Sequence, residues 1–325
     1  MVIVILNWNG KHLLEQFLPS VVRYSSGVGL YVIDNASTDG SVLFLQEHYP
    51  QIKIVQNAEN YGYAKGYNEG LKHIPADVYC LINSDVEVTP HWLEAPMHIF
   101  AHDPQVSILQ PKIKSYKQRN CFEYAGAAGG YIDKYGFSYC RGRVFDTIEE
   151  DTGQYEEQTP IFWASGACFF IRASVFEHLG GFDEDFFAHQ EEIDFCWRAQ
   201  NEGYKVYYTP LSQIYHLGGA TLEQGSTQKV FLNFRNSLFM LLKNLPKEAW
   251  FSTIFLRMVL DGIAGIRFFF QGKLSYTWAI LRAHFAFYKY FFHFYHKRKN
   301  PMLKQYYSVK SIAYSYFIKN KKVGY

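Results

Sequence analysis

Short apolar runs alternate with helical patterns through the first part of the chain, and this alternation constrains the fold more than any other feature. The runs cover residues 2–6, 30–34, 52–56 and 78–82. Between the first two runs, apolar residues recur at the spacing of a helix with one buried face. Asp39 can cap a further short helix that continues through Leu45. Strands that alternate with helices predict a mainly parallel sheet with crossover helices, so we expect an α/β fold.

Small polar residues follow all four predicted strands. The segments are NWNG at residues 7–10, DNAS at 34–37, NAENYG at 57–62 and NSD at 83–85. Any one of them is compatible with a simple turn, because Asn, Asp and Gly tolerate turn conformations. In open α/β sheets, however, the ligand crevice lies beyond the carboxyl ends of the strands. The four segments together therefore predict a ligand site.

Local structure is less readable further along the chain. Residues 110–160 are rich in Gly, Tyr and acidic residues without clear periodicity, which is typical of irregular hairpins, and we expect a mobile loop near residues 149–157. A strand-like run at residues 168–171 follows, and a Gly-Gly turn at residues 180–181 precedes a helical segment at residues 191–200.

Charge divides the chain at Leu242. Residues 1–242 hold 17 Lys and Arg against 28 Asp and Glu, a net charge of −11, whereas residues 243–325 hold 15 against 2, a net charge of +13. The basic part also carries 22 of the 60 Phe, Trp and Tyr residues, and helices are predicted at residues 250–270 and 276–295. This composition suits an anionic membrane surface or nucleic acid. Because no nucleic-acid recognition module is visible, we expect membrane contact, with packing on the preceding domain as the alternative.

Cellular location follows from the apolar stretches and the cysteines. Arg257, Asp261 and Arg267 interrupt residues 250–270, the most apolar stretch, so we expect peripheral contact rather than a membrane span. The chain opens on a strand-like run without a signal-peptide pattern. Its five cysteines show no CxxC spacing, which disfavours disulfides and a zinc site. We expect a cytoplasmic protein at the inner face of the membrane.

Five segments in order carry a resemblance to a known family. They are NWNG, VIDNASTDGS, NAENYGYAKGYNEG, LINSDVEVTP and GGFDEDFFAHQEEIDFCWR. Together they resemble family 2 of the inverting glycosyltransferases over roughly residues 1–220, with weak similarity to rhamnosyltransferases. The resemblance implies a GT-A fold, a nucleoside diphosphate sugar donor, a divalent metal (Mg or Mn), and a glycan or lipid-linked acceptor in cell-surface polysaccharide synthesis.

The resemblance also implies a division of the chain. A catalytic domain would cover residues 1–225, with a nucleotide-sugar half at about residues 1–110 and an acceptor half at about residues 111–225. The basic, aromatic helical extension would then cover residues 226–325.

The family's nucleotide site would lie at the strand ends. Asp34 would accept the imide N–H of uracil or thymine, which predicts a UDP or dTDP sugar; alternatively it only shapes the turn to Ser37. Gly62 would allow close backbone approach. The remaining nucleotide-binding candidates are Asn7, Trp8, Asn9, Asn60, Asn68, Asn83 and Ser84. Tyr61 and Tyr63 are left open between core packing and stacking.

The segment from Asn83 to Asp85 occupies the place of the family's DxD motif, with Asn in place of the first acid. Asp85 can still hold a hard divalent cation when the donor's phosphate oxygens supply further ligands. His216 matches a late family position that often completes the metal shell, although a single His is more often structural. We predict Asp85 and His216 as the metal ligands.

Transfer to a hydroxyl needs a base and electrophilic help to the departing diphosphate. Glu191, Glu192 and Asp194 match the family's Glu-Asp-x-Asp pattern, with Glu192 at the position usually taken by the catalytic Asp. We predict Glu192 as the base and Glu191 as the alternative. Asp194 would orient the site or pair with Arg198, one turn along. All three acids could instead be favourable charge at a helix N-terminus.

Sugar and acceptor contacts are predicted for Trp163, Gly166 and Ala167, with a core role for Trp163 as the alternative. Arg235 either reaches the diphosphate or is a solvated helix charge.

Three other functions are considered. Sugar nucleotidyltransferases usually carry a Gly-rich loop with Arg and Lys after the first strand, where this chain has NWNG. A dehydrogenase is disfavoured because no GxGxxG follows a strand. A GT-A-like binding or scaffold protein, disabled by Asn83 and Glu192, remains the non-enzyme alternative.

Overall fold

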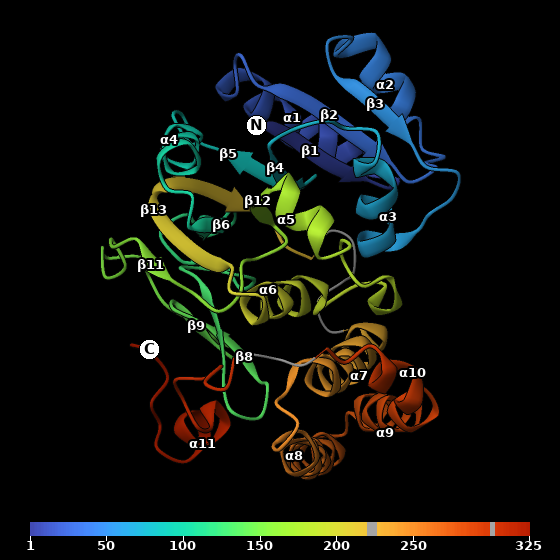
Figure 1. Cartoon of the computed structure of the whole chain (residues 1–325), viewed down its shortest axis with the longest axis vertical. Helices are drawn as coiled ribbons and strands as arrows, with labels where there is room; N and C mark the ends of the chain where they lie inside the picture. Colours follow the sequence, from blue (N-terminus) through green and yellow to red (C-terminus); the bar gives the residue numbers. More distant parts are fainter. Residues whose placement is uncertain (220–225, 300–302) are drawn as a thin grey trace.

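The computed structural model describes residues 1–219, 226–299 and 303–325. Within these ranges, a nine-stranded sheet runs in the order β11-β13-β6-β12-β4-β1-β2-β3, and β5 pairs with β13. Figure 1 shows the N-terminal strands and helices at one end of the molecule and α7 to α10 at the other. The mixed α/β architecture confirms the predicted fold class.

The N-terminal half of the sheet is parallel. Its strands are β1 (Val2–Asn7), β2 (Gly29–Asp34), β3 (Lys53–Gln56) and β4 (Val78–Asn83). All four were predicted, with ends that differ by one residue. In register, Asn7 lies opposite Asp34 and Leu6 lies opposite Asn83. The polar residues that end β1, β2 and β4 are therefore neighbours at one edge of the sheet.

Helices connect these strands, as the alternation predicted. They are α1 (Lys11–Tyr24), α2 (Ser41–His48) and α3 (Gly62–Leu71). The buried side of α1 consists of the residues whose spacing predicted it, including Leu13 and Phe17. Asp39 Oδ1 accepts a hydrogen bond from the Ser41 backbone N–H at 3.0 Å, but the N-cap of α2 is Gly40.

The other half of the sheet is mixed. It contains β5 (Val86–Val88), β6 (Val106–Ser115), β11 (Thr159–Pro160), β12 (Cys168–Arg172) and β13 (Lys205–His216), with α4 (Glu94–His102) between β5 and β6. Strand β12 is antiparallel to both β4 and β6, whereas β13 is parallel to β6. The start of residues 110–160, for which the sequence predicted no regular structure, thus belongs to the long strand β6. The first eight residues of β6 are all buried, so no polar alternation marks it in the sequence.

Four short strands form a second sheet in the order β10-β9-β8-β7. They are β7 (Gly130–Ile132), β8 (Ser138–Cys140), β9 (Arg143–Val144) and β10 (Thr147–Ile148), which agrees with the predicted irregular hairpins. After β12 come α5 (Ala173–His178), a single 3₁₀ turn (Glu184–Phe186) and the predicted helix α6 (Glu191–Asn201).

The C-terminal part is helical. It comprises α7 (Thr227–Asn244), α8 (Trp250–Phe270), α9 (Leu274–Lys289), α10 (Phe291–His296) and α11 (Ile312–Phe317). The single helix predicted at residues 276–295 is wrong, because Tyr290 has ψ of 13° and separates α9 from α10. The predicted domain boundary at residue 225 lies outside the described residues. Buried side chains of α7 belong to the same hydrophobic core as those of α6.

The chain end returns to the small sheet, where the Ile312 backbone N–H donates to Asp133 Oδ2 at 2.9 Å. All five cysteines are free thiols, as their spacing predicted. No helix in the described ranges combines the length and the apolar character that a membrane crossing requires.

Candidate functional site

The ends of β1 and β2 are joined by side-chain hydrogen bonds. Asn7 Nδ2 donates to Asp34 Oδ1 at 3.0 Å and to Ser37 Oγ at 3.2 Å, and Asp34 Oδ2 accepts from the Ser37 backbone N–H at 2.8 Å. Both Asn7 and Asp34 are buried. These are the contacts of the alternative interpretation, in which Asp34 shapes the turn to Ser37. Asn7 Oδ1 is buried without a hydrogen-bond partner.

The loop after β1 folds over this turn. Asn9 has a left-handed φ of 48°, and its Oδ1 accepts from the Thr38 backbone N–H at 2.7 Å. Trp8 is 47% exposed, so its ring is accessible to a ligand. Ser84 approaches the same loop, since a Cβ at Gly10 would lie 3.7 Å from Ser84 Oγ.

Gly62 is required for a close backbone approach within the protein itself. It has φ of 73°, and a Cβ there would lie 3.0 Å from the backbone oxygen and the ring of Phe187. The Gly62 N–H donates to Asn60 Oδ1 at 3.0 Å. The loop that begins α3 is therefore packed against the segment that precedes α6.

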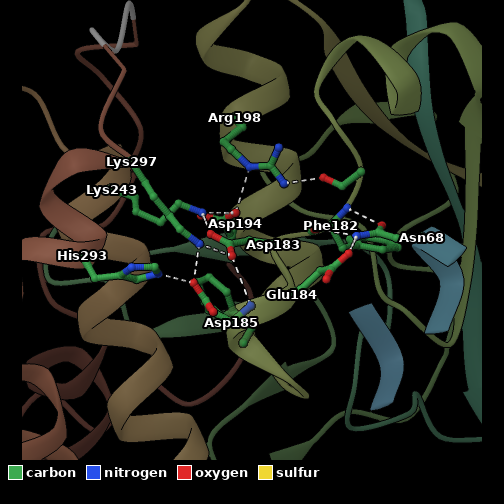
Figure 2. A network of polar contacts seen from close by, with 12 residues as sticks. Asn68, Phe182, Asp183, Glu184, Asp185, Asp194, Arg198, Lys243, His293 and Lys297 are labelled. Carbon is green, nitrogen blue, oxygen red and sulfur yellow. Dashed lines mark hydrogen bonds and ion pairs between the residues drawn. The ribbon is translucent and has the colours of Figure 1, made fainter. Parts of the chain in front are cut away.

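Asn68 lies at a different place from the strand ends. Its Nδ2 donates to the Phe182 carbonyl at 2.9 Å and to Glu184 Oε1 at 3.0 Å, and its Oδ1 accepts from the Phe182 N–H at 2.9 Å (Figure 2). The amide of Asn68 is thus engaged in holding the turn after α5.

Asp85 and His216 face each other between β5 and the end of β13. His216 Nε2 lies 3.1 Å from Asp85 Oδ1, and both side chains are buried. Asn83 Nδ2 lies 3.4 Å from the same ring nitrogen. On the other side of the ring, Nδ1 lies 3.4 Å from Glu123 Oε2. Sequence reasoning missed Glu123, because it stands in an irregular segment without a motif.

The charges around His216 and Asp85 shift the pKa values of both side chains. Burial lowers the pKa of His216, but the carboxylates of Asp85 and Glu123 outweigh it and raise the pKa to about 10. Burial likewise raises the pKa of Asp85, but His216 holds it below its usual value. The imidazole is therefore a cation at neutral pH, placed between two carboxylates.

The donor chemistry at this place fits a divalent cation. Asp85 offers a hard oxygen and His216 a nitrogen, a set that suits Mn²⁺ or a similar ion once the proton leaves the ring. Glu123 stands where the carboxylate partner of a ligating His is usually found. Across the described residues, no three or more His, Cys, Asp or Glu side chains form a complete metal shell. Donor phosphates would have to supply the remaining ligands.

The two glutamates at the start of α6 are desolvated. Burial raises the pKa of Glu192 to about 7, and burial together with the charge of Glu192 raises the pKa of Glu191 further above its usual value. One carboxylate oxygen of each, Oε2, is buried without a hydrogen-bond partner. Both carboxyl groups therefore keep a proton to higher pH than an exposed glutamate, and the pKa of Glu192 lies close to neutral pH.

Tyr63 connects these acids to the small-residue segment before β12. Its hydroxyl donates to the Gly166 carbonyl at 3.1 Å. Burial raises the pKa of Tyr63, and the charges of Glu191 and Glu192 raise it further, which puts both acids in its vicinity. Ala167 is also close to the metal candidates, since its carbonyl accepts from the Asn83 N–H at 3.1 Å.

Asp194 belongs to a buried ion network (Figure 2). Its Oδ2 accepts from Arg198 Nε at 2.9 Å, as predicted, and from Lys243 Nζ at 2.8 Å. Lys243 also pairs with Asp183 at 2.6 Å, and Lys297 pairs with Asp183 at 2.7 Å. The network joins α6, the turn after α5 and the C-terminal helices. Asp194 is thereby a structural anchor for α6.

The segment before α6 is strained and held from α7. Phe187, His189 and Gln190 all have left-handed φ values, between 64° and 74°. Asn236 Nδ2 donates to the backbone carbonyls of Ala188 at 2.9 Å and His189 at 2.7 Å. Arg235 donates to the Phe186 carbonyl at 3.2 Å, so it braces this loop.

Trp163 is a core residue in this structure. It is buried, its Nε1 donates to the Tyr131 carbonyl at 3.0 Å, and its ring leaves no room for a Cβ at Gly130. These contacts agree with the alternative core interpretation.

Comparisons with known proteins identify the family. Residues 2–180 match the family described as "Glycosyl transferase family 2". The chain is 25% identical over 224 residues to an N-acetylglucosaminyl-diphospho-decaprenol L-rhamnosyltransferase of Mycobacterium tuberculosis, covering 64% of this chain and 72% of that one. It is 23% identical over 286 residues to a low-salt glycan biosynthesis hexosyltransferase of Haloferax volcanii, covering 84% and 86%.

A solved structure shares the fold. The crystal structure of GalNAc-T7 with UDP, GalNAc and Mn²⁺ superposes with a TM-score of 0.56 at 17% identity, covering 74% of this chain and 47% of that one. At this identity the likeness concerns the fold alone. Since the family match spans more than half of the chain, the protein belongs to glycosyl transferase family 2 and is a glycosyltransferase with a GT-A fold.

Proposed function

We propose that this enzyme transfers a sugar from UDP or dTDP onto a glycan or lipid-linked acceptor, with inversion at the anomeric carbon. The observation that carries the proposal is the desolvated carboxyl pair at the start of α6, in which burial raises the pKa of Glu192 to about 7 and that of Glu191 above its usual value. A base with a pKa near the working pH is effective in proton transfer.

In this mechanism Glu192 takes the proton of the acceptor hydroxyl. The acceptor oxygen forms a bond to the anomeric carbon as the bond from that carbon to the diphosphate oxygen breaks. Asp85 and His216 would hold the divalent cation, which when bound supplies electrophilic stabilisation of the departing diphosphate. Asn7, Asn9 and Trp8 would contact the nucleotide at the ends of the strands.

The preference for a uracil or thymine nucleotide is proposed from the contacts of Asp34. Its carboxylate uses one lone pair on each oxygen for Asn7 and Ser37, which leaves acceptor capacity for an imide N–H. The lipid-linked acceptor is proposed because one relative is named for a diphospho-decaprenol substrate and another for glycan biosynthesis. Synthesis of a cell-surface polysaccharide at the inner face of the membrane would follow.

The test is nucleotide release and binding. Purified protein with Mn²⁺ is titrated with UDP, dTDP, GDP and ADP in a calorimeter, and donor turnover is measured with a membrane-lipid extract as acceptor. We expect uracil or thymine nucleotides to bind in a metal-dependent way and a nucleoside diphosphate to be released. Binding without turnover of any sugar nucleotide would indicate the scaffold alternative, and pyrophosphate release from a nucleoside triphosphate would indicate a nucleotidyltransferase.

A further inference from the structure

Helix α8 places two of its three charged residues, Arg257 and Asp261, on the inside. Arg257 and Asp261 are buried and paired, with Arg257 Nε 2.8 Å from Asp261 Oδ1. His284 of α9 lies 3.4 Å from Asp261 Oδ2, and Arg257 also donates to the Tyr135 carbonyl at 3.1 Å. Two of the three charges that interrupt the apolar pattern of this helix in the sequence are therefore directed into the protein, whereas Arg267 is exposed.

The outward side of α8 is apolar. Its exposed large side chains recur at helical spacing and include Phe251, which is 70% exposed, and Phe270, which is 82% exposed. The others are Phe255, Leu256, Val259, Ile263, Ile266 and Phe269. A helix in contact with water normally has the reverse arrangement, with its polar residues outside. This helix is suited to an apolar environment on its outer side.

Helix α9 adds a second apolar stripe next to the first. The two helices pack together, and Thr277 Oγ1 of α9 donates to the Gly265 carbonyl of α8 at 2.9 Å. The exposed stripe of α9 consists of Leu274, Trp278, Leu281, Phe285 and Tyr288. Figure 1 shows α8 and α9 at the end of the molecule opposite α2. We call the two stripes together the α8–α9 face.

Charge indicates what covers this face. Exposed basic residues lie on both helices or close to their ends: Lys247, Arg267, Lys273, Arg282 and Lys289. From residue 243 onward the sequence has two acids, and one of them, Asp261, is buried in the Arg257 pair. A second copy of the chain on this face would bring like charges together. An anionic lipid surface complements both the apolar stripes and the basic rim.

We propose that the α8–α9 face lies in the interface of an anionic membrane, with its aromatic and aliphatic side chains among the lipids and its basic rim at the headgroups. Because no described helix is fit to cross a bilayer, the contact is parallel to the membrane plane. This membrane contact would bring the enzyme to a lipid-linked acceptor, and only that purpose depends on the proposed function.

The α8–α9 face is tested by co-sedimentation of the full-length protein with vesicles. Phosphatidylcholine vesicles with and without roughly 30% phosphatidylglycerol are compared at low salt and at about 0.5 M salt. The test variant is Phe255→Ser with Phe285→Ser, and a charge variant is Lys273→Glu with Arg282→Glu. The matched control is Leu43→Ser, an exposed apolar residue on α2 at the far end of the molecule.

We expect wild type and the Leu43 control to pellet with anionic vesicles, and both test variants to bind at least ~10-fold more weakly with an unchanged melting temperature. High salt should weaken wild-type binding. Equal binding of wild type and both variants, or no preference for anionic lipid, overturns the proposal. So does a dimer in sedimentation velocity that the Phe255 variant abolishes while vesicle binding is absent.

Vesicle binding is measured without donor or acceptor, so its result does not depend on whether the enzyme transfers a sugar. Binding without sugar transfer leaves the α8–α9 face in place and removes the proposed reaction. Transfer to a water-soluble acceptor without vesicle binding would support the proposed reaction and rule out the membrane contact of the α8–α9 face.

Discussion

His216 Nε2 lies 3.1 Å from Asp85 Oδ1, which brings the end of β13 onto the segment that follows β4. The two residues are 131 positions apart in the chain, and only the pairing of β13 with β5 makes them neighbours. This contact defines the proposed metal site, because it joins an oxygen and a nitrogen donor at one point.

The first prediction concerns this site. Asp85→Asn should weaken metal-dependent binding of a nucleoside diphosphate by ~10-fold or more, since it removes the carboxylate of the pair. Calorimetry with Mn²⁺ and with EDTA measures the effect. Glu87→Gln, two residues later on β5 and paired with exposed Arg119, is the matched control and should bind normally. If Asp85→Asn binds nucleotide as tightly as wild type with Mn²⁺, the metal assignment is wrong.

The second prediction concerns the base. Glu192→Gln should lower the rate of transfer by ~10²-fold or more while donor binding is kept, because the amide cannot accept the proton. Glu191→Gln should have a smaller effect, since Glu192, and not Glu191, occupies the position proposed for the base. Glu202→Gln, at the exposed end of the same helix, is the control. A dead Glu191→Gln enzyme with an active Glu192→Gln enzyme would reverse the assignment.

The pH profile is a third, separate test of the same carboxylate. Glu192 acts as a base only when ionised, and its pKa is raised to about 7. The kcat/KM of wild type should therefore rise with pH through about 7 and level off above it. A profile that is flat from pH 5 to 8 would contradict a base with this pKa.

The fourth prediction concerns the loop that leads into α6. Asn236→Ala removes the donor for the Ala188 and His189 carbonyls and leaves buried acceptors unpaired, which costs about 1–3 kcal/mol. We expect kcat to fall while the dissociation constant of the donor nucleotide changes little, because the strained loop positions the glutamates and not the strand ends. Gln228→Ala, at an exposed position near the start of α7, is the comparison. Equal losses in kcat and in nucleotide affinity would indicate general unfolding instead.

The fifth prediction concerns stability. Lys243→Met leaves Asp183 and Asp194 with one fewer buried cation and should lower the free energy of unfolding by about 3 kcal/mol. Lys247→Met, exposed beyond the end of α7, should be neutral. Chemical denaturation of both variants provides the comparison, and equal stability of the two would show that the network contributes little.

Acid dependence follows from the same network. Burial raises the pKa of Asp183, but Lys243 and Lys297 outweigh it and hold the pKa well below its usual value. A carboxylate with a depressed pKa in the folded state contributes stability above the unfolded pKa, near 4, and that contribution is lost as the pH falls. Wild type should therefore lose stability below about pH 4, and Lys243→Met should lose less over that range.

The sequence by itself determined the parts that depend on local patterns. The four N-terminal strands were predicted to within one residue, because each is a short, mainly apolar run that ends at or immediately before Asn or Asp. The same polar ends predicted a ligand edge, since parallel strands place their carboxyl ends together. The pairing of Asp194 with Arg198 was also predictable, because residues four apart on a helix are neighbours.

The tertiary structure decided what depends on contacts between distant segments. Glu123 beside His216, Asn236 under the loop before α6, and Lys243 on Asp194 each join residues tens of positions apart, so no local pattern marks them. The orientation of α8 is the clearest case. In the sequence, Arg257 and Asp261 only interrupt the apolar stretch, but their mutual pairing inside the protein satisfies both charges and leaves the apolar side facing outward.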